Sequence, residues 1–399
     1  MKNFLTKLII LALTLALSVS FIACDKDGDG DTRITGKYEY KVMTGTKDDG
    51  STYKYYAITG YQISSEDAES ISNNDYSKID AKYREITIPA KGTEIGAPED
   101  YDIEEIAAGA FSGAKILTKV TVGDNIKKIG SGAFANCVNL AEIELPFTGK
   151  ALDAHNQEKH FAYIFGSAST EDGNVEITAK ANAFKNADGE ELATADDITF
   201  TLPVSLTKVT IKSTEIKNSA FYGVSTVEEV NIPNVTDIES HAFYGCSMLR
   251  KIDLSSVKNI YQYAFSDCTS LYSVVLGEEL KTIDHHAFNN CIKLGDVATG
   301  VTATPFTLPA SLESLGKSAF ASCSKLGEVI VPASITEIPE SCFASCTYML
   351  KLQVLGDNVV FKASSLASCT RLDKNVVDKD GNKLELDNLV FGIRVSSAV

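Results

Sequence analysis

Apolar residues return at fixed places along most of this chain, and their spacing predicts a stack of similar coils. Between Val235 and Pro332 the residues follow the order V-x-x-I-x-x-x-A-F-x-x-C-x-x-L-x-x-I-x-L, after which the phrase starts again. Successive copies are marked by Phe221, Phe243, Phe265 and Phe288, which lie 22, 22 and 23 residues apart. A fixed period of this size is typical of solenoids, in which each repeat packs on its neighbours.

Each repeat combines a strand pattern with a helix-like pattern. Its end alternates polar and apolar residues, as in Lys251-Ile252-Asp253-Leu254, which is the period of a β-strand. Its middle, x-x-x-A-F-x-x-C-x-x-L, places apolar residues three apart, which predicts a single turn of α- or 3₁₀-helix. We therefore expect each coil to hold one short strand and one short helical turn. Stacked coils would pair their strands in a parallel sheet and bury Phe on Phe, Cys on Cys and Leu on Leu.

The A-F-x-x-C phrases at this period resemble the leucine-rich repeats of bacterial BspA-like proteins. The resemblance covers roughly Tyr83 to Val377, and the longer unit Phe161–Phe184 is similar to that family's stretched repeats. It implies an α/β solenoid: a right-handed leucine-rich repeat superhelix with short parallel strands on the concave side and short helical turns opposite. For many members it also implies adhesion at the cell surface to host or microbial partners.

The first residues predict export. A basic start at Lys2 and Lys7 precedes an apolar run that ends at Ala23, so residues 1–23 read as a secretory signal peptide. The next residue, Cys24, completes a phrase that resembles a bacterial lipobox, although Phe21 stands where Leu is usual. An ordinary signal peptide followed by an unrelated Cys is the alternative. We favour lipidation of Cys24, because this cysteine lies outside the repeat ladder, and predict membrane attachment through the N-terminal lipid only.

Residues 24–36 form an acidic stretch behind that cysteine. Asp25-Lys26-Asp27-Gly28-Asp29-Gly30-Asp31 matches the first half of a calcium loop, but the twelfth position, where a bidentate Glu is needed, is Gly36. We interpret the stretch as a solvated tether, and predict no metal site and no cofactor. Next to a lipidated Cys, such a stretch is also similar to surface-export signals of some lipoproteins, whereas Asp directly after the Cys signals inner-membrane retention in other bacteria.

The charge of the chain limits the classes of partner that it is expected to bind. The formal net charge of −16 becomes −18 once residues 1–23, with two lysines and no acids, are removed. A chain this acidic is a poor binder of nucleic acid and of anionic lipid surfaces. We expect a protein or glycan ligand and no nucleic acid; the sequence does not determine the oligomeric state. No later segment is apolar and long enough to span a membrane.

The repeat boundaries predict a domain plan. Residues 37–82 form an N-terminal cap, 83–377 the solenoid, and 378–399 a C-terminal cap. Uneven spacing of the Phe residues predicts inserted loops near 147–176, 188–197 and 298–305. The first loop, which carries several His and aromatic residues, is either a binding element or a hairpin packed on the coil edge.

Seven cysteines occupy one position of the repeat: Cys137, Cys246, Cys268, Cys291, Cys323, Cys346 and Cys369. A cysteine that returns once per coil behaves as a small buried hydrophobe, so we expect free thiols. A disulfide is the alternative, with Cys342–Cys346 as the pair to examine. His241 and His286 share another position two coils apart, about 10 Å, which is too far for one metal ion.

Catalytic motifs are missing from the sequence. There is no H-E-x-x-H and no G-x-S-x-G, and Gly316-Lys317-Ser318 lacks the earlier glycine of a P-loop, since that position is Ser311. We therefore predict that the protein is not an enzyme.

The residue between the two apolar residues of each strand points away from the core and defines a candidate ligand-binding row. We name it the strand-face row: Thr121, Glu144, Thr210, Asn231, Asp253, Val275, Ile330 and Gln353. The resulting hypothesis is an exported lipoprotein, anchored to the bacterial cell envelope at its outer surface, that binds a protein or glycan through the concave face and inserted loops. The alternative is an envelope scaffold without a host partner.

Overall fold

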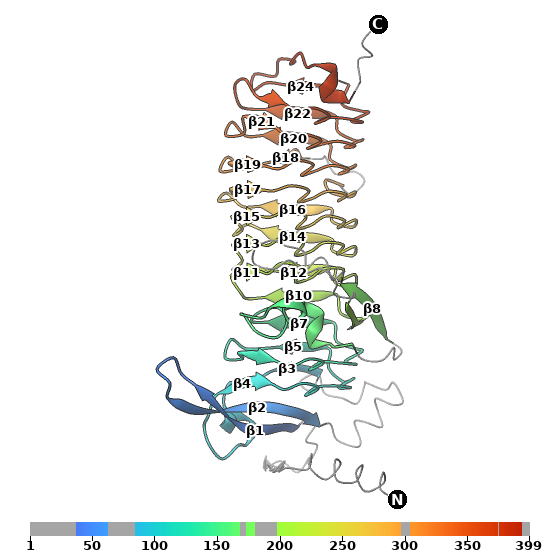
Figure 1. The fold of residues 1–399 in the computed structure, drawn as a ribbon. Helices are drawn as coiled ribbons and strands as arrows, with labels where there is room; N and C mark the ends of the chain where they lie inside the picture. Colours follow the sequence, from blue (N-terminus) through green and yellow to red (C-terminus); the bar gives the residue numbers. More distant parts are fainter. Residues whose placement is uncertain are drawn as a thin grey trace, which may run out of the picture.

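The computed structural model describes residues 37–62, 84–167, 173–179, 198–296, 304–373 and 375–392. Its coils lie one above another and form a long column, with the blue N-terminal strands at one end and the red C-terminal segment at the other (Figure 1). Cys24, the acidic tether and residues 63–82 of the expected N-terminal cap lie outside the described residues.

One ladder of parallel strands runs along the column. Its first part is a seven-stranded sheet made of β3 (Glu85–Thr87), β5 (Lys119–Thr121), β7 (Glu142–Leu145), β10 (Lys208–Ile211), β12 (Glu229–Asn231), β14 (Lys251–Leu254) and β16 (Ser273–Leu276). Its second part is a four-stranded sheet of β18 (Phe306–Thr307), β20 (Glu328–Val331), β22 (Lys351–Val354) and β24 (Val376–Val377). The alternating pattern at the end of each repeat therefore predicted these parallel strands correctly.

A second ladder, which the sequence analysis missed, runs beside the first. It contains β11 (Glu215–Ile216), β13 (Asp237–Ile238), β15 (Asn259–Ile260), β17 (Thr282–Ile283) and β19 (Ser314–Leu315), followed by the pair β21 (Glu337–Ile338) and β23 (Val360–Phe361). These strands are only two residues long, so no alternation marks them. The sequence feature that could have predicted them is the Ile of the V-x-x-I phrase, which is fully buried at Ile238 and Ile260.

The predicted helical turns are wrong for the described coils. His241, two residues before Phe243, has a left-handed φ of 58°, which interrupts any helix there. The amide of Phe243 then donates to the carbonyl of Ala264 on the next coil at 2.7 Å rather than along its own segment. The repeat's middle is thus a series of turns bonded across coils. Short 3₁₀ helices occur instead at η2 (Gly92–Ile95), η3 (Asn156–Lys159), η4 (Phe161–Ile164) and η6 (Asn388–Phe391).

The core is a column of stacked phenylalanines, as predicted. The ring centroids of Phe243 and Phe265 lie 5.0 Å apart with an interplanar angle of 4°, and those of Phe265 and Phe288 lie 5.1 Å apart at 4°. Phe288 and Phe320 stack at 5.3 Å although 32 residues separate them. The insertion between these two residues therefore leaves the core of the column unbroken.

The stretched part of the solenoid is built around Phe161. Its ring stacks on Phe221 at 4.8 Å, while Phe165 contacts Phe134 at 6.4 Å, so these two residues carry the stack from one regular coil to the next. β7 pairs directly with β10 across this stretch. Phe184, the copy marked by the sequence pattern, lies outside the described residues.

The first expected loop, near 147–176, is largely packed over its described residues. Phe147, His160, Phe161 and Phe165 are all buried, which favours the packed alternative for this part of the segment. The chain then forms an antiparallel hairpin of β8 (Asn174–Ala179) and β9 (Ile198–Pro203) on the side of the column (Figure 1).

Both ends of the Phe stack are covered. At the N-terminal end, β1 (Lys37–Thr46) and β2 (Thr52–Gln62) form an antiparallel hairpin that pairs with β4 (Ile103–Ile106), itself followed by β6 (Lys128–Ile129), and Tyr61 of the hairpin contacts the ring of Phe111 at 5.3 Å. At the C-terminal end, the amide of Leu366 donates to the carbonyl of Val390, which is buried.

Candidate binding surface

The structure brings most of the strand-face row together in register. Thr121 pairs with Glu144, Glu144 with Thr210, and Thr210 with Asn231 on successive strands. Asp253 pairs with Val275 farther along the same sheet. Each of these residues is flanked by more buried neighbours, so the row lies on the outer side of the strands. Ile330 and Gln353 pair on the four-stranded sheet and form a separate, shorter row.

Several polar members of the row already have partners within the chain. The Glu144 carboxylate pairs with Lys212 at 2.6 Å, and Asn231 donates to the Thr210 hydroxyl at 3.4 Å. Asp253 accepts the backbone amide of Ser255 at 2.9 Å. These contacts fix the side chains, so a ligand would meet a preorganised surface, which lowers the entropy cost of binding.

Val275 is the unusual member of the row, because half of its surface, 50%, is exposed although the side chain is apolar. Tyr272, three residues earlier, is also exposed. An exposed apolar residue is ordinary by itself, but two such side chains within four residues, one on β16 and one just before it, offer apolar surface suited to contact with a partner.

A column of alternating charge lies beside the row. The first residues of successive strands are Glu85, Lys119, Glu142, Lys208, Glu229 and Lys251, paired in that order. Lys119 and Lys208 lie 3.1 and 3.5 Å from Glu142, and Lys251 lies 3.1 Å from Glu229. Each charge faces an opposite charge on the next coil, so a strand slipped by one coil would bring like charges together. The column therefore supports the coil order and leaves little net charge for a ligand.

The ladder cysteines are held by a shared hydrogen bond. In the described residues all eight cysteines are free thiols, as the repeat predicted, and Cys342 and Cys346 are not bridged. Each thiol in the repeat position donates to the carbonyl of the ladder Phe on the preceding coil, at 3.1 to 3.2 Å. The pairs are Cys137–Phe111, Cys246–Phe221, Cys268–Phe243, Cys291–Phe265, Cys323–Phe288, Cys346–Phe320 and Cys369–Phe343. Burial raises the pKa of Cys137 to about 12, so this thiol is structural and unreactive.

His241 and His286 belong to an aromatic stack that sequence reasoning did not find. Tyr263 lies between them, with ring centroids 5.0 Å from His241 and 4.6 Å from His286. All three residues have left-handed φ values between 56° and 58°, which turns their side chains the same way. Their occurrence two residues before each ladder Phe was the available signal. Because the ring faces cover one another, the stack stabilises the turns and offers only ring edges to a ligand.

A shallow groove lies between the two ladders. Its volume is about 510 Å³ and its lining includes Thr236, Ser255, Lys258 and Glu279. Lys258 and Glu279, which both line the groove, form an ion pair at 3.1 Å.

Two further properties concern the described residues. They contain no group of three or more His, Cys, Asp or Glu side chains placed to hold a metal ion. Within the same ranges, no helix has the length and apolar character needed to cross a membrane.

Parallel two-stranded coils, a continuous Phe stack and a ladder of buried Leu and Cys define a leucine-rich repeat β-solenoid of about ten turns. The family model described as "BspA type Leucine rich repeat region (6 copies)" matches residues 69–188, 193–303 and 300–388, and this chain belongs to that family.

Solved structures of bacterial leucine-rich repeat proteins are similar to the chain. A leucine-rich repeat protein from T. pallidum is 27% identical, with 41% of this chain and 77% of that chain covered and a TM-score of 0.30. A leucine-rich repeat protein from Bacteroides ovatus is 17% identical, with 85% and 77% covered and a TM-score of 0.31. A leucine rich cell surface protein from Faecalibacterium prausnitzii is 18% identical, with 85% and 93% covered and a TM-score of 0.28. No curated protein matches the sequence.

Proposed function

We propose that this protein is a cell-surface lipoprotein that binds a protein or glycan partner through the strand-face row, on the side expected to be concave, and through its inserted loops. Membership of the BspA-type family supports a surface role, since such proteins are generally surface-exposed and related to adhesion. The same membership favours binding over catalysis, because leucine-rich repeat folds are typically non-enzymatic.

The observation that carries this proposal is the register of the strand-face row. Thr121, Glu144, Thr210 and Asn231 stand on consecutive strands of one rigid sheet, with an exposed Val275 farther along it. Such a surface is extended and preorganised, which suits a large partner better than a small substrate, since small-molecule sites are usually enclosed pockets.

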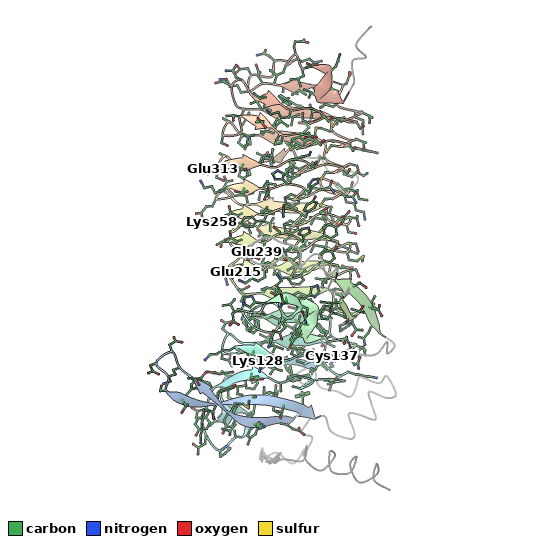
Figure 2. All side chains as sticks on the ribbon, in the orientation of Figure 1. Lys128, Cys137, Glu215, Glu239, Lys258 and Glu313 are labelled. Carbon is green, nitrogen blue, oxygen red and sulfur yellow. The ribbon has the colours of Figure 1, made fainter. Side chains whose placement is uncertain are left out.

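Photo-crosslinking tests this surface. A photoreactive amino acid at Val275 should capture a partner from intact cells or their surroundings, because this side chain is half exposed on the outer side of the strand. The matched control is the same amino acid at Glu313, which is exposed and lies with Glu215, Glu239 and Lys258 along the second ladder (Figure 2). Equal capture at both positions, or capture at Glu313 alone, would contradict the proposed face.

The lipid anchor is part of the same proposal. Cys24 would carry the acyl chains, and residues 24–36 would act as a tether between the membrane and the column. Labelled palmitate should enter the wild-type protein and not the Cys24→Ser variant. Proteolysis of intact cells would then test surface exposure, and a chain protected until lysis would contradict it.

An envelope scaffold is the second candidate function. The alternating charge column and the covered Phe stack give a stiff rod, which is a property that a scaffold needs. Crosslinking at Val275 separates the two functions, since a scaffold should capture only proteins of the cell's own envelope.

A further inference from the structure

Tyr348 lies between two cations on the neighbouring coils. The Lys325 ammonium is 4.6 Å from the centre of the Tyr348 ring, and the Arg371 guanidinium carbon is 4.7 Å from it. The Tyr348 side chain is nevertheless 47% exposed. Because Lys325 and Arg371 belong to coils on either side of Tyr348, the three side chains form one short line along the column.

This line follows from one position of the repeat, two residues after each ladder cysteine. Lys293, Lys325, Tyr348 and Arg371 follow Cys291, Cys323, Cys346 and Cys369 in that position. The coils are stacked by the cysteine hydrogen bonds described above, so these four side chains occupy successive levels. At about 4.8 Å per coil, Lys325 and Arg371 are roughly 10 Å apart.

Few carboxylates pair with the cations of this line, although the chain as a whole is acidic. Arg371 and Lys293 are exposed and form no ion pair with a carboxylate among the described residues, and Lys325 has only Asp296 at 3.8 Å. Elsewhere the exposed lysines are commonly paired, as Lys317 is with Glu340 at 3.0 Å. The ring of Tyr348 holds both flanking cations by cation–π attraction, so they are partly ordered before any ligand arrives.

Hydroxyl groups accompany the cations. Ser324, Thr347 and Thr370 directly precede Lys325, Tyr348 and Arg371, whereas Ile292 precedes Lys293. The Ser324 hydroxyl donates to the carbonyl of Ile292 at 3.0 Å, and the Thr370 hydroxyl donates to that of Thr347 at 3.4 Å. Each hydroxyl oxygen therefore keeps lone pairs that are able to accept a hydrogen bond.

We propose that Lys325, Tyr348 and Arg371, with Lys293 and the adjacent hydroxyls, bind a linear anionic polysaccharide that lies along the column. Cations at intervals of one and two coils along the column match a polymer with repeating anionic groups. The Ser and Thr oxygens accept hydrogen bonds from sugar hydroxyls. A polysaccharide carries more hydroxyl groups than an acidic protein surface or a layer of phospholipid headgroups, so these oxygens favour a polysaccharide. This surface lies in the turn before the strands and is separate from the strand-face row.

Fluorescence polarisation of the purified full chain with labelled heparin oligosaccharide, a sulfated glycan, tests the proposal. Hyaluronan oligosaccharide supplies a carboxylated glycan and dextran a neutral one. We expect binding of at least one of the two anionic glycans, weakening with added salt, and no binding of dextran. The Lys325→Ala/Arg371→Ala variant and the Tyr348→Ala variant should each weaken binding at least tenfold, whereas Tyr348→Phe should retain it.

The matched control is Lys258→Ala/Lys317→Ala, which removes two cations that are paired with acids on other parts of the column. It should bind the glycan as the wild type does, and all variants should keep the wild-type circular dichroism and unfolding midpoint. Wild-type affinity in Lys325→Ala/Arg371→Ala, or no binding of either anionic glycan, would overturn the proposal. Binding of a Glu-rich peptide or of phosphatidylserine vesicles in place of the glycans would also overturn it. The crosslinking test at Val275 is independent of these outcomes, because it probes a different surface.

Discussion

The thiol of Cys268 donates to the carbonyl oxygen of Phe243 on the preceding coil, with the sulfur 3.1 Å from the oxygen. The same carbonyl also accepts the amide of Cys246 within its own turn. One backbone oxygen thus joins a local turn to the coil that follows. Repetition of this contact explains why a small residue with a weak donor returns at this position, although Val224 shows that an apolar residue also fits there.

Substitution of Cys268 should separate the contributions of packing and of hydrogen bonding to the free energy of unfolding. Cys268→Val keeps the buried volume and loses only the weak donor, so we expect about 1 kcal/mol of destabilisation. Cys268→Ala also leaves a cavity and should cost about 2 kcal/mol. Urea unfolding followed by circular dichroism measures both. An alanine variant as stable as the valine variant would show that the site collapses around the missing atoms.

The Phe161 ring should matter as much as any regular ladder phenylalanine. Phe161→Ala removes a fully buried ring that stacks on Phe221, so we expect a loss of about 3–5 kcal/mol, similar to that of Phe243→Ala. Urea unfolding of the two variants gives the comparison. A cost below about 1 kcal/mol for Phe161→Ala would mean that the stack does not pass through this residue.

Buried His160 should make stability depend on pH. Its Nδ1 accepts the amide of Ala162 at 3.1 Å, which assigns the proton to Nε2, 3.0 Å from the carbonyl of Tyr222. Burial, the largest cause, lowers the pKa of His160 from 6.5 to about 4. The folded state therefore keeps the ring neutral while the unfolded chain takes up a proton below pH 6.5. Stability should fall as the pH drops from 6.5 to 4, by at most about 3 kcal/mol.

This dependence is measured as the free energy of unfolding against pH. His160→Gln should flatten the curve between pH 4 and 6.5, whereas substitution of the exposed His155 in the same segment should leave its shape unchanged. An identical slope in wild type and His160→Gln would assign the effect to other groups.

Reversal of one charge in the alternating column should weaken the coil contact. Lys251→Glu places a carboxylate opposite Glu229, whose pKa is held below its usual value by its hydrogen bond with Lys251. Since both side chains are partly exposed, we expect less than about 1 kcal/mol of destabilisation, and the effect should shrink in 1 M salt. Lys41→Glu makes the same charge change on the terminal hairpin and serves as the control in thermal unfolding. Equal losses in the two variants would show a general charge effect rather than a pairwise one.

Reactivity of the cysteines should follow their burial. Burial raises the pKa of Cys369 to about 11 and that of Cys137 to about 12. Among the eight cysteines that the structure describes, only Cys369 is partly exposed. In the folded protein at pH 8, an alkylating reagent should therefore modify Cys369 first and leave the other ladder cysteines intact. Mass spectrometry of the peptides identifies the order, and early modification of Cys268 would contradict the burial of the ladder.

Much of the fold could be predicted because its main contacts repeat. The stack of Phe243, Phe265 and Phe288 and the parallel strands follow from period and alternation alone, since identical coils place like residues over like. The second ladder could not be predicted in this way, because strands such as Asp237–Ile238 are too short to show alternation. The helical turns were wrong for a related reason: a spacing of three fits both a helix and a turn, and only the left-handed backbone at His241 decides between them.

The candidate surfaces, like the fold, could be predicted from the sequence only in part. The strand-face row was listed from sequence, because side chains in a strand point alternately to opposite sides. Its division between two sheets, and the passage of the Phe stack through Phe161, depend on how the irregular segments pack. The position of Tyr348 between Lys325 and Arg371 likewise arises only when consecutive coils are stacked. The sequence by itself determined the repeating core and its buried cysteine position, because those contacts depend on period. The tertiary structure alone decided the irregular coil, because it depends on contacts between residues that no period relates. It also decided the turn conformation and the cation–aromatic contacts, because a repeat position by itself fixes neither the backbone φ nor the distances between side chains.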